Sequence, residues 1–387
     1  MISKQLPLYD LAEWKNGLAF RKIDFSNKGK PVIKIAELKN GITGQTQFTN
    51  GNYGEAVSLT RGDMVFSWSG NPETSIDVFW YDLPDGWLNQ HIFKVTPSEC
   101  VDKKYLYYLL KSLKSTFTAI ASNKQTTGLG HVTIKDLKEL IIDLPIRSTQ
   151  EAISNYLYAL DSKIHLNKQL NDNLLDQMQA LYKSWFVDFI PFGGSKPRTW
   201  IETDIYELAN IIYGAPFKSK QFNTDGIGKP IIRIRDLKEQ QFTTYTIEVH
   251  PKGYLLQPGD IVVGMDGEFR PYIWGNDEAW LNQRVCVFEN KRPSGKAFLY
   301  FTIKPLLYGI EQTQVATTVI HIGKKDFDAF EITLPDTSTL DNFDALTAPM
   351  MKVIVSNSFE NKKLAALRDI LLPKLMSGEI DASGIQL

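Results

Sequence analysis

The sequence lacks the patterns that mark several common classes of protein. Only two cysteines occur among its 387 residues, Cys100 and Cys286, and they form no Cys-x-x-Cys pattern, so neither a disulfide framework nor a zinc site is predicted. No run of about 18 apolar residues is present, and the N-terminal residues have no signal-peptide shape, so we expect a cytoplasmic protein without a membrane partner. The net charge of −1 argues mildly against tight DNA binding by this chain alone, because phosphate contacts supply most non-specific affinity.

Catalytic motifs are missing as well. There is no Gly-x-x-x-x-Gly-Lys-Ser/Thr phosphate loop, so no ATP motor is expected. Asn71-Pro72 begins like the Asn-Pro-Pro-Tyr motif of adenine methyltransferases, but Glu73 follows, and no glycine-rich cofactor loop precedes it. The five histidines lack metal-ligand spacing and a Ser or Asp partner, and His131 and His321, each ahead of a Lys-Asp pair, are predicted to be structural. We therefore predict no catalytic residue, no metal site and no bound cofactor, and neither methyl transfer nor DNA cleavage by the chain alone.

What the sequence does contain is a repeat that extends over almost its whole length. Leu8–Ala12 (LYDLA) is answered by Ile205–Ala209 (IYELA), and Gly29–Lys39 is matched by Gly228–Lys238. Further matches are Gly17–Phe20 with Gly214–Phe217, Leu59–Asp63 with Leu256–Asp260, Leu88–Gln90 with Leu281–Gln283, and Lys135–Leu137 with Lys325–Phe327. Because 43% of the residues are hydrophobic and 22% charged, each half can form a packed core. Each half is predicted to be a globular α/β module followed by one long helix.

Within each module, β-branched runs predict short strands. The expected strands are 32–35, 63–67 and 92–95 in the first half, and 231–234, 260–264 and 285–288 in the second. A helix is expected at about 103–114, with a weaker equivalent at about 297–308. Residues 192–197 have no periodicity and are predicted to link the halves.

Two heptad patterns predict a pair of long helices. The first is expected from about Gln150 to Phe186, with Ser148–Glu151 as its N-cap and first turn. Its seam consists of Ile153, Leu157, Leu160, Ile164, Asn167, Asn171, Leu174, Met178, Leu181 and Trp185. The matching positions, 190 residues later, are Phe343, Thr347, Met350, Ile354, Asn357, Asn361, Leu364, Arg368, Leu371 and Leu375. Since buried asparagines fix register, we expect an antiparallel coiled coil that brings the four asparagines together. The alternative is two unrelated amphipathic helices, each buried in its own domain.

Two residues fit the second pattern poorly. Pro349 has no N–H to donate, so it is expected to start the best stretch of the second helix or to kink it. Arg368 is a charged residue at a seam position, and the neighbouring Leu367 is the alternative occupant.

Hydrogen-bonding and basic residues gather in equivalent loops of the two halves. Ser67–Asn71 and Met265–Arg270 occupy the same place but differ in sequence, as do Asn123–Thr127 and Gln312–Thr318. Unlike polar loops on a shared frame are what two readers of different base sequences need. An ordinary solvated face is the alternative explanation of the basic residues. The candidate DNA-binding residues are Arg21, Lys22, Lys28, Lys30, Ser67, Trp68, Ser69, Asn71, Asn89, Gln90, Lys124, Gln125, Thr126 and Thr127 in the first half, and Lys218, Ser219, Lys220, Arg233, Arg235, Asp266, Arg270, Asn282, Gln283, Arg284, Gln312, Gln314, Thr317 and Thr318 in the second.

One polar pair is the same in both halves. Asn89-Gln90 and Asn282-Gln283 occur at matched positions with no difference between them. Residues that discriminate bases should differ between two unlike readers, so these pairs are expected to hold protein or phosphate backbone.

The tandem architecture and the two helix ends resemble a known family. Leu181–Phe189 (LYKSWFVDF) and Leu371–Ile380 (LLPKLMSGEI) look like the helix ends of the specificity subunit of Type I restriction–modification systems, and the resemblance covers the whole chain. It implies an α+β fold in which two pseudo-repeated α/β target-recognition domains are separated by two long antiparallel helices forming a coiled coil. It also implies a non-catalytic subunit that reads a bipartite, asymmetric target in double-stranded DNA, with one domain per half-site.

The resemblance also implies partners. The family's specificity subunit docks two adenine-N6 methyltransferase subunits, and restriction (helicase–nuclease) subunits join them; S-adenosylmethionine, ATP and Mg²⁺ are used by these partners. Exposed apolar residues at the helix ends are the docking candidates. They are Trp185, Phe186, Leu375 and Met376.

The competing function is a self-contained tandem nuclease or hydrolase with one active site per module. A duplicated enzyme should repeat a catalytic cluster, whereas the matched positions here are mostly glycine, proline and apolar residues. The expected boundaries are 1–148 for the first recognition domain, 149–190 for the first helix, 191–197 for a linker, 198–337 for the second domain, 338–378 for the second helix and 379–387 for a tail.

Overall fold

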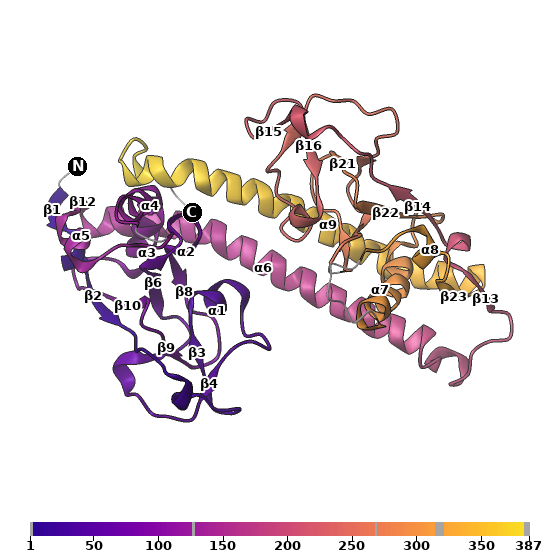
Figure 1. The fold of residues 1–387 in the computed structure, drawn as a ribbon, viewed down its shortest axis with the longest axis horizontal. Helices are drawn as coiled ribbons and strands as arrows, with labels where there is room; N and C mark the ends of the chain where they lie inside the picture. Colours follow the sequence, from indigo (N-terminus) through magenta and orange to yellow (C-terminus); the bar gives the residue numbers. More distant parts are fainter. Residues whose placement is uncertain (1–2, 126–127, 268, 314–320, 383–387) are drawn as a thin grey trace. The chain divides into compact units, whose positions relative to one another are not determined.

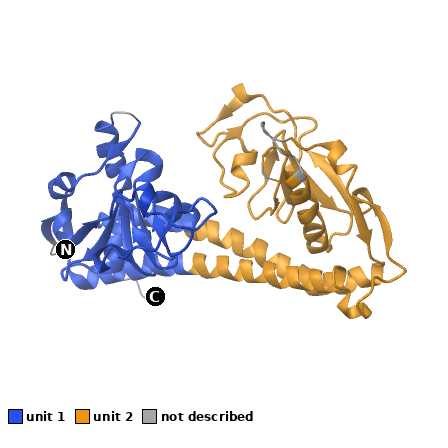
Figure 2. Ribbon diagram, turned by 60° about the horizontal axis from the view of Figure 1, so that its bottom comes forward, with its two compact units in different colours: residues 1–162, 365–387 blue, residues 163–364 orange. Residues whose placement is uncertain are grey.

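The computed structural model describes residues 3–125, 128–267, 269–313 and 321–382. The chain is mixed helix and sheet and divides into two compact units (Figure 2). The first unit comprises Met1–Ser162 with Ala365–Leu387, and the second comprises Lys163–Leu364. The division falls inside two long helices, α6 (Arg147–Phe186) and α9 (Thr337–Met376), so each long helix contributes to both units.

The first unit is built on two four-stranded sheets (Figure 1). Its strands are β1 (Ser3–Pro7), β2 (Ala12–Asn16), β3 (Lys30–Ile33), β4 (Phe48–Thr49), β5 (Ser58–Leu59), β6 (Met64–Ser67), β7 (Ser69–Gly70), β8 (Asp77–Trp80), β9 (Gly86–Leu88), β10 (Ile92–Pro97), β11 (Gly130–His131) and β12 (Ile141–Pro145). One sheet is antiparallel with the order β2-β10-β6-β8. The other has the order β4-β3-β9-β5 and contains the parallel pair β3–β9. Two short antiparallel pairs, β1–β12 and β7–β11, complete the unit.

The first unit also contains helices. They are α1 (Ile35–Asn40), α2 (Pro72–Ser75), α3 (Lys103–Ser112), α4 (Lys114–Asn123) and α5 (Ile134–Glu139). The Asp102 carboxylate accepts a hydrogen bond from the Tyr105 N–H at 2.8 Å and so caps the start of α3. Tyr105 and Phe117 are both buried, and Phe117 packs on Phe66 of β6 with ring centroids 4.9 Å apart. The core therefore lies between the antiparallel sheet, α3 and α4, and the start of α6.

The second unit repeats these strand orders and adds one edge strand, β15 (Phe222–Asn223), to its second sheet. Its elements are β13 (Ile201–Asp204), β14 (Ala209–Tyr213), β15 (Phe222–Asn223), β16 (Lys229–Ile232), β17 (Tyr245–Thr246), β18 (Leu255–Leu256), β19 (Ile261–Gly264), β20 (Pro271–Ile273), β21 (Ala279–Leu281), β22 (Val285–Asn290), α7 (Lys296–Thr313), α8 (Lys324–Phe327) and β23 (Glu331–Leu334). The sheet β14-β22-β19-β20 matches β2-β10-β6-β8 in order and direction. In the second sheet β16 pairs with β21 in parallel, as β3 does with β9. The predicted internal repeat and fold class are confirmed.

Several predicted boundaries differ from the observed ones. The strands expected at 32–35 and 231–234 end at Ile33 and Ile232, because the chain turns there into α1 and into a 3-10 turn. The helix expected at about 103–114 is followed directly by α4, which starts at Lys114. Its weaker equivalent in the second half, α7, runs over 18 residues despite Pro305 inside it. Among the described residues, no helix is long and apolar enough to cross a membrane.

The first long helix starts earlier than its expected N-cap. The prediction that Ser148 caps the helix is wrong, since α6 already begins at Arg147. Gln150 holds this end in place with its side chain, which is 1% exposed. Its Oε1 accepts from the Asp102 N–H at 2.8 Å, and its Nε2 donates to the carbonyls of Pro145 at 2.8 Å and Cys100 at 3.2 Å. The ten seam positions of α6 are all buried or half-buried, as the heptad pattern predicts.

The two long helices pair antiparallel within each unit (Figure 1). In the second unit the Asn167 Nδ2 donates to the Asn361 Oδ1 at 3.0 Å, and the Asn357 Nδ2 donates to the Asn171 Oδ1 at 2.8 Å. The contacts run in opposite directions along the two helices, and the four asparagines lie together as predicted. Asn167 is 3% exposed and also donates to the Glu360 carboxylate at 2.7 Å, so its buried amide has charged and neutral partners.

Of the two expected irregularities of the second helix, the replacement of Arg368 by Leu367 in the seam is wrong, and a kink at Pro349 stays a prediction. Pro349 does not start the helix, since α9 begins twelve residues earlier at Thr337, where the Asp336 carboxylate accepts from the Thr339 N–H at 2.9 Å. This hydrogen bond and a second one from the Ser338 hydroxyl at 2.9 Å lower the pKa of Asp336 to about 2. Arg368 keeps its seam position and donates to the Asp161 carboxylate at 2.7 Å in the first unit, whereas Leu367 is 40% exposed. An ion pair with the facing helix satisfies the guanidinium there, so no leucine is needed.

Removing one asparagine of a pair should destabilise the second unit. Asn171→Leu leaves the Asn357 amide without its acceptor, and we expect a loss of about 1–2 kcal/mol in the free energy of unfolding. The double variant Asn171→Leu/Asn357→Leu should cost less than the sum of the two single variants, because both polar partners leave together. Urea unfolding of the four proteins gives the coupling. Additive losses would mean that the pair makes no stabilising contact; Asp172→Ala, an exposed neighbour on α6, is the control.

Candidate nucleic-acid interface

In the first unit, three side chains converge where the central strands end. Ser69 of β7 pairs with His131 of β11, and the Ser69 Oγ lies 2.8 Å from the His131 Nδ1. His91 lies in the turn before β10 and is exposed. Trp68 lies between them, with its ring stacked on Phe93 at 5.6 Å and within 6 Å of both imidazole rings. Burial and the neighbouring His131 lower the pKa of His91. We call Ser69, His91 and His131 the strand-end cluster of the first unit.

The second unit places three different side chains on the same frame. Asp266 follows β19 and bridges to His321, whose Nδ1 lies 2.5 Å from the Asp266 Oδ1. The same carboxylate oxygen lies 3.9 Å from the Nη1 of Arg284, in the turn before β22. Asp266, Arg284 and His321 form the strand-end cluster of the second unit.

The backbone shows that the two clusters are equivalent. The Trp68 N–H donates to the His91 carbonyl at 3.3 Å, and the Met265 N–H donates to the Arg284 carbonyl at 2.8 Å. The Val132 N–H donates to the Trp68 carbonyl, and the Ile322 N–H donates to the Met265 carbonyl, both at 2.9 Å. The backbone contacts therefore match Ser69, His91 and His131 with Asp266, Arg284 and His321, respectively. The two clusters share their backbone, and their side chains differ at two of the three positions.

The histidines were assigned only a structural role from the sequence, and their partners were missed. His131 and Ser69 are 62 positions apart, and His321 and Asp266 are 55 apart, so no local spacing indicates these contacts. A usable signal was present in the matched order of the repeat, because His131 and His321 each precede a Lys-Asp pair.

The Asn-Gln pairs that both halves share directly precede His91 and Arg284 in the sequence. Asn89 and Asn282 are buried, and each forms a parallel bridge, to Leu18 in the first unit and to Ala215 in the second. A Cβ on Gly17 would stand 2.2 Å from the Asn89 carbonyl oxygen, which explains the glycine shared by both halves. The asparagine turns thus hold protein backbone; a contact to phosphate stays a prediction.

Exposed basic residues lie in the loops that come directly after the Leu18–Asn89 and Ala215–Asn282 bridges. In the first unit the chain continues from Leu18 to Arg21 and Lys22, and in the second it continues from Ala215 to Lys218 and Lys220. Lys28, Ser219, Arg235, Gln283, Gln125 and Gln312 are also exposed. Gln90 is half-buried, and its Nε2 lies 3.2 Å from the Nε2 of His91. Lys30 is half-buried and pairs with Asp85 at 3.6 Å.

Five other candidates have roles inside the protein. Ser67 is fully buried, so it presents no surface to DNA. Asn71 caps α2, and its Oδ1 accepts from the N–H groups of Glu73 and Thr74. The other three form ion pairs: Lys124 with Asp136, Arg233 with Asp236, and Arg270 with Glu311. Thr126, Thr127, Gln314, Thr317 and Thr318 lie outside the described residues.

The expected docking residues are part of the cores. Leu375 is 1% exposed and packs in the core of the first unit, with Met376 against it. Trp185 and Phe186 pack on Phe343 in the second unit, with ring centroids 5.8 and 4.9 Å apart. Leu375 is therefore not available for docking, whereas Trp185, Phe186 and Met376 are half-buried, and docking of partners at the helix ends stays a prediction.

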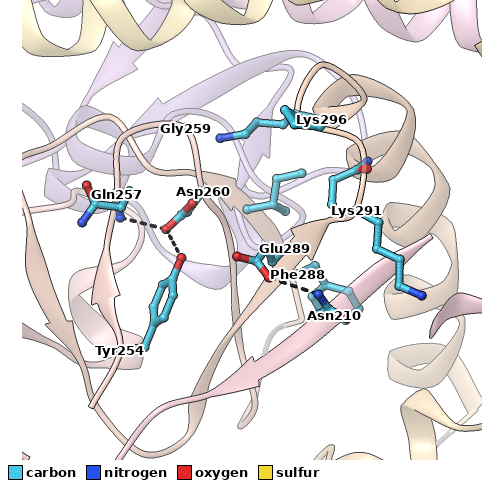
Figure 3. A pocket seen from close by; sticks show the side chains of 12 residues that line it. Asn210, Tyr254, Gln257, Gly259, Asp260, Phe288, Glu289, Lys291 and Lys296 are labelled. Carbon is cyan, nitrogen blue, oxygen red and sulfur yellow. Dashed lines mark hydrogen bonds between the residues drawn. The ribbon is translucent and has the colours of Figure 1, made fainter. Parts of the chain in front are cut away.

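A pocket of about 520 Å³ lies in the second unit between β14, β19, β22 and the start of α7 (Figure 3). Burial raises the pKa of Asp260, which accepts from the Gln257 N–H at 2.8 Å and the Tyr254 hydroxyl at 3.0 Å. Asp63 holds the same turn in the first unit, through the Thr60 N–H at 2.8 Å. The second carboxylate of the pocket, Glu289, is matched by Thr96 in the repeat. Asp260 therefore closes a turn that both units share. The pair of carboxylates in the pocket, Asp260 and Glu289, is not repeated in the first unit.

A methyl group on the glycine behind the second cluster should damage the unit. An added Cβ on Gly214 would lie 2.0 Å from the Asn282 carbonyl oxygen, so we expect Gly214→Ala to lower the free energy of unfolding by about 1–3 kcal/mol. Gly309→Ala in α7 is the matched control, because its Cβ would meet nothing within 4 Å and alanine favours a helix. Thermal unfolding compares the two. Equal melting temperatures for both variants would show that the close approach does not matter.

Comparison with known proteins gives a consistent result. The family model described as Type I restriction modification DNA specificity domain matches residues 3–176 and again residues 197–367. The chain is 36% identical over 138 residues to the Type I restriction enzyme EcoBI specificity subunit of Escherichia coli, a match that covers 35% of this chain and 29% of that subunit. It is 25% identical to the HindI specificity subunit of Haemophilus influenzae, with 84% of this chain and 87% of that subunit covered.

The fold is also similar to a solved structure. The crystal structure of the S subunit of a Type I restriction–modification system from M. genitalium matches with a TM-score of 0.55 and 17% identity, covering 97% of this chain and 96% of that one. At this identity the match concerns the fold alone. Since the two family matches together span most of the sequence, with one on each half, the chain belongs to the Type I restriction–modification DNA specificity family.

Proposed function

We propose that this chain is the sequence-reading subunit of a Type I restriction–modification complex, and that each unit reads one of two unlike half-sites in double-stranded DNA. The observation that carries the proposal is the strand-end cluster, which occurs once in each unit with the same backbone hydrogen bonds. Ser69 and His91 in the first unit are replaced by Asp266 and Arg284 in the second. Side chains that differ on a common frame suit two modules that bind different base pairs.

Affinity for the DNA backbone needs a second source. The loops that follow the Leu18–Asn89 and Ala215–Asn282 bridges offer the exposed charges of Arg21, Lys22, Lys218 and Lys220, but the whole chain has a net charge of −1. Because phosphate contacts supply much of the affinity, partner subunits have to contribute. Two adenine-N6 methyltransferase subunits and the restriction subunits of the complex are the proposed partners.

The chemistry of the complex then belongs to those partners. S-adenosylmethionine, ATP and Mg²⁺ would be bound by the methyltransferase and restriction subunits, and this chain would contribute sequence choice. An independent tandem enzyme is not favoured, because Thr96 stands in the first unit where Glu289 lines the pocket of the second.

Methylation mapping tests the function. When the full chain is co-expressed with its methyltransferase, the methylated adenines should lie in two unlike short sequences separated by a fixed number of unread base pairs. The purified chain with S-adenosylmethionine and DNA, but without the partner, should transfer no methyl group. A single continuous site, or methylation by the chain alone, contradicts the proposal.

The length of the long helices should set the gap between the half-sites. Deleting residues 160–166 from α6 together with 362–368 from α9 removes one heptad from each helix and keeps Asn167 opposite Asn361. Seven helical residues correspond to about 10 Å, or roughly three base pairs. The unread gap in the methylation map should shorten by that amount, with both half-site sequences unchanged. A deletion in α6 alone, which breaks the register, is the control. Changed half-site sequences would refute the idea that the helices act as a spacer.

A further inference from the structure

The turn that carries Arg284 has an unusual backbone. Arg284 has φ 71°, and among the described residues other than glycine only Phe189 and Gln240 also have positive φ. Side chains with a Cβ rarely adopt this conformation, and it persists where the surrounding structure enforces it. Here the Arg284 carbonyl accepts from the Met265 N–H at 2.8 Å, so the turn is tied to the end of β19. The conformation therefore places the Arg284 side chain in the strand-end cluster at an energetic cost.

The Arg284 side chain is exposed but oriented. Its side chain is 55% exposed, as is that of His321, whereas the Asp266 carboxylate between them is 22% exposed. One Asp266 oxygen contacts the His321 Nδ1 at 2.5 Å and lies 3.9 Å from the Arg284 Nη1. A guanidinium has five N–H donors, and this ion pair involves a single nitrogen. Most N–H donors of the Arg284 guanidinium therefore face solvent, and the contact with Asp266 fixes the orientation of the guanidinium.

We propose that Arg284, positioned by Asp266 and His321, reads a guanine in the half-site of the second unit. The proposal rests on the proposed function and adds a base and a residue to it. Guanine offers two acceptors, N7 and O6, in the major groove, and a guanidinium donates to both at once. A directed, exposed guanidinium is suited to this pairing.

A phosphate contact explains the arrangement less well. A phosphate requires only positive charge, and the Asp266 carboxylate at 3.9 Å would repel it. Lys218 and Lys220, in the loop that follows the Ala215–Asn282 bridge, are exposed, and among the described residues neither ammonium forms an ion pair; the Glu248 carboxylate accepts from the Lys218 backbone N–H at 2.8 Å. The nearby carboxylate instead favours an uncharged ligand that carries hydrogen-bond acceptors, such as the edge of a base. Binding of such a ligand depends on the orientation of the guanidinium donors.

The first unit carries a different reader at the equivalent place. His91 replaces Arg284, and Ser69 replaces Asp266, so neither the guanidinium nor its carboxylate is present there. His91 is not among the residues with positive φ, and its Nε2 lies 3.2 Å from the Gln90 side chain. Substitutions at Arg284 should therefore affect only one of the two half-sites, and His91→Ala should affect only the other.

Arg284→Gly is the sharpest test, because glycine adopts positive φ without strain and the turn is kept. The full chain carrying Arg284→Gly is co-expressed with the methyltransferase, and the methylated sites are mapped. Preference for guanine at one base pair of one half-site should fall about ten- to a hundredfold, while the other half-site stays unchanged. Arg284→Lys should lose the same preference, because an ammonium lacks the paired donors. Asp266→Asn should weaken preference at that same base pair, and Asp266→Glu should restore part of it.

Lys218→Ala is the control for a phosphate contact. It should weaken binding of the complex equally for all sequences and reduce the salt dependence by about one phosphate, without changing the sequence preference. The same uniform loss in Arg284→Gly, with both half-sites unaltered, would overturn the guanine contact and leave the proposed function intact. If instead the wild-type complex shows no sequence preference, the proposed function fails and the guanine contact fails with it. Thermal unfolding of each variant confirms that the fold is retained.

Discussion

The antiparallel pairing of α6 and α9 is the interaction on which both units depend. Each long helix begins in the unit built from its own half of the sequence and ends in the other unit. Leu375, near the end of α9, is 1% exposed in the core of the first unit, and Met178 of α6 is fully buried in the core of the second. Neither half of the sequence therefore contains a complete core, although the repeat suggests two independent modules. Folding has to bring together residues about 200 positions apart before either core can close.

Polar contacts fix the register of this pairing. A seam of leucines alone would tolerate sliding by a heptad, whereas the asparagine pairs and the Asp161–Arg368 ion pair are satisfied in one alignment. Tyr108 adds a second contact to Asp161, to which its hydroxyl donates at 2.7 Å. An ion pair of this kind adds little net stability, so its value lies in specifying which residues face each other. Register matters because the helix ends complete the cores.

The sequence predicts what depends on periodicity and repetition. The heptad seam, the meeting of the four asparagines and the matched strands of the two halves follow from spacing and repetition. The ends of strands and helices do not, because single residues such as Gln150 decide them through contacts with distant backbone. An apolar residue at a helix end fits a docking surface as well as a core, so the burial of Leu375 does not follow from its place in the sequence.

The candidate interface was predicted unevenly for a similar reason. The loops that carry it follow from the repeat, and Asp266 and Arg284 were among the candidates. Their organisation does not follow, because the Asp266–His321 contact joins residues 55 positions apart and the positive φ of Arg284 has no sequence signature. Ser67 and Arg233 show the opposite error. Both are polar residues in candidate loops, yet one is fully buried and the other is bound to Asp236 and to Thr244.

The charge of the chain is compatible with sequence reading because selectivity and affinity have different sources. Specificity is a difference between two binding free energies, and a cluster with internally balanced charges can supply it. In the second unit the Asp266 carboxylate offsets the Arg284 guanidinium, so this cluster adds little attraction for phosphates in general. If Arg284 reads a base as proposed, a wrong base leaves the oriented donors unpaired, which is costly, and non-specific DNA gains little from the site. In such a complex, the near-neutral chain would discriminate bases and the partners would supply most of the phosphate binding. We would expect this chain to release wrong sequences readily.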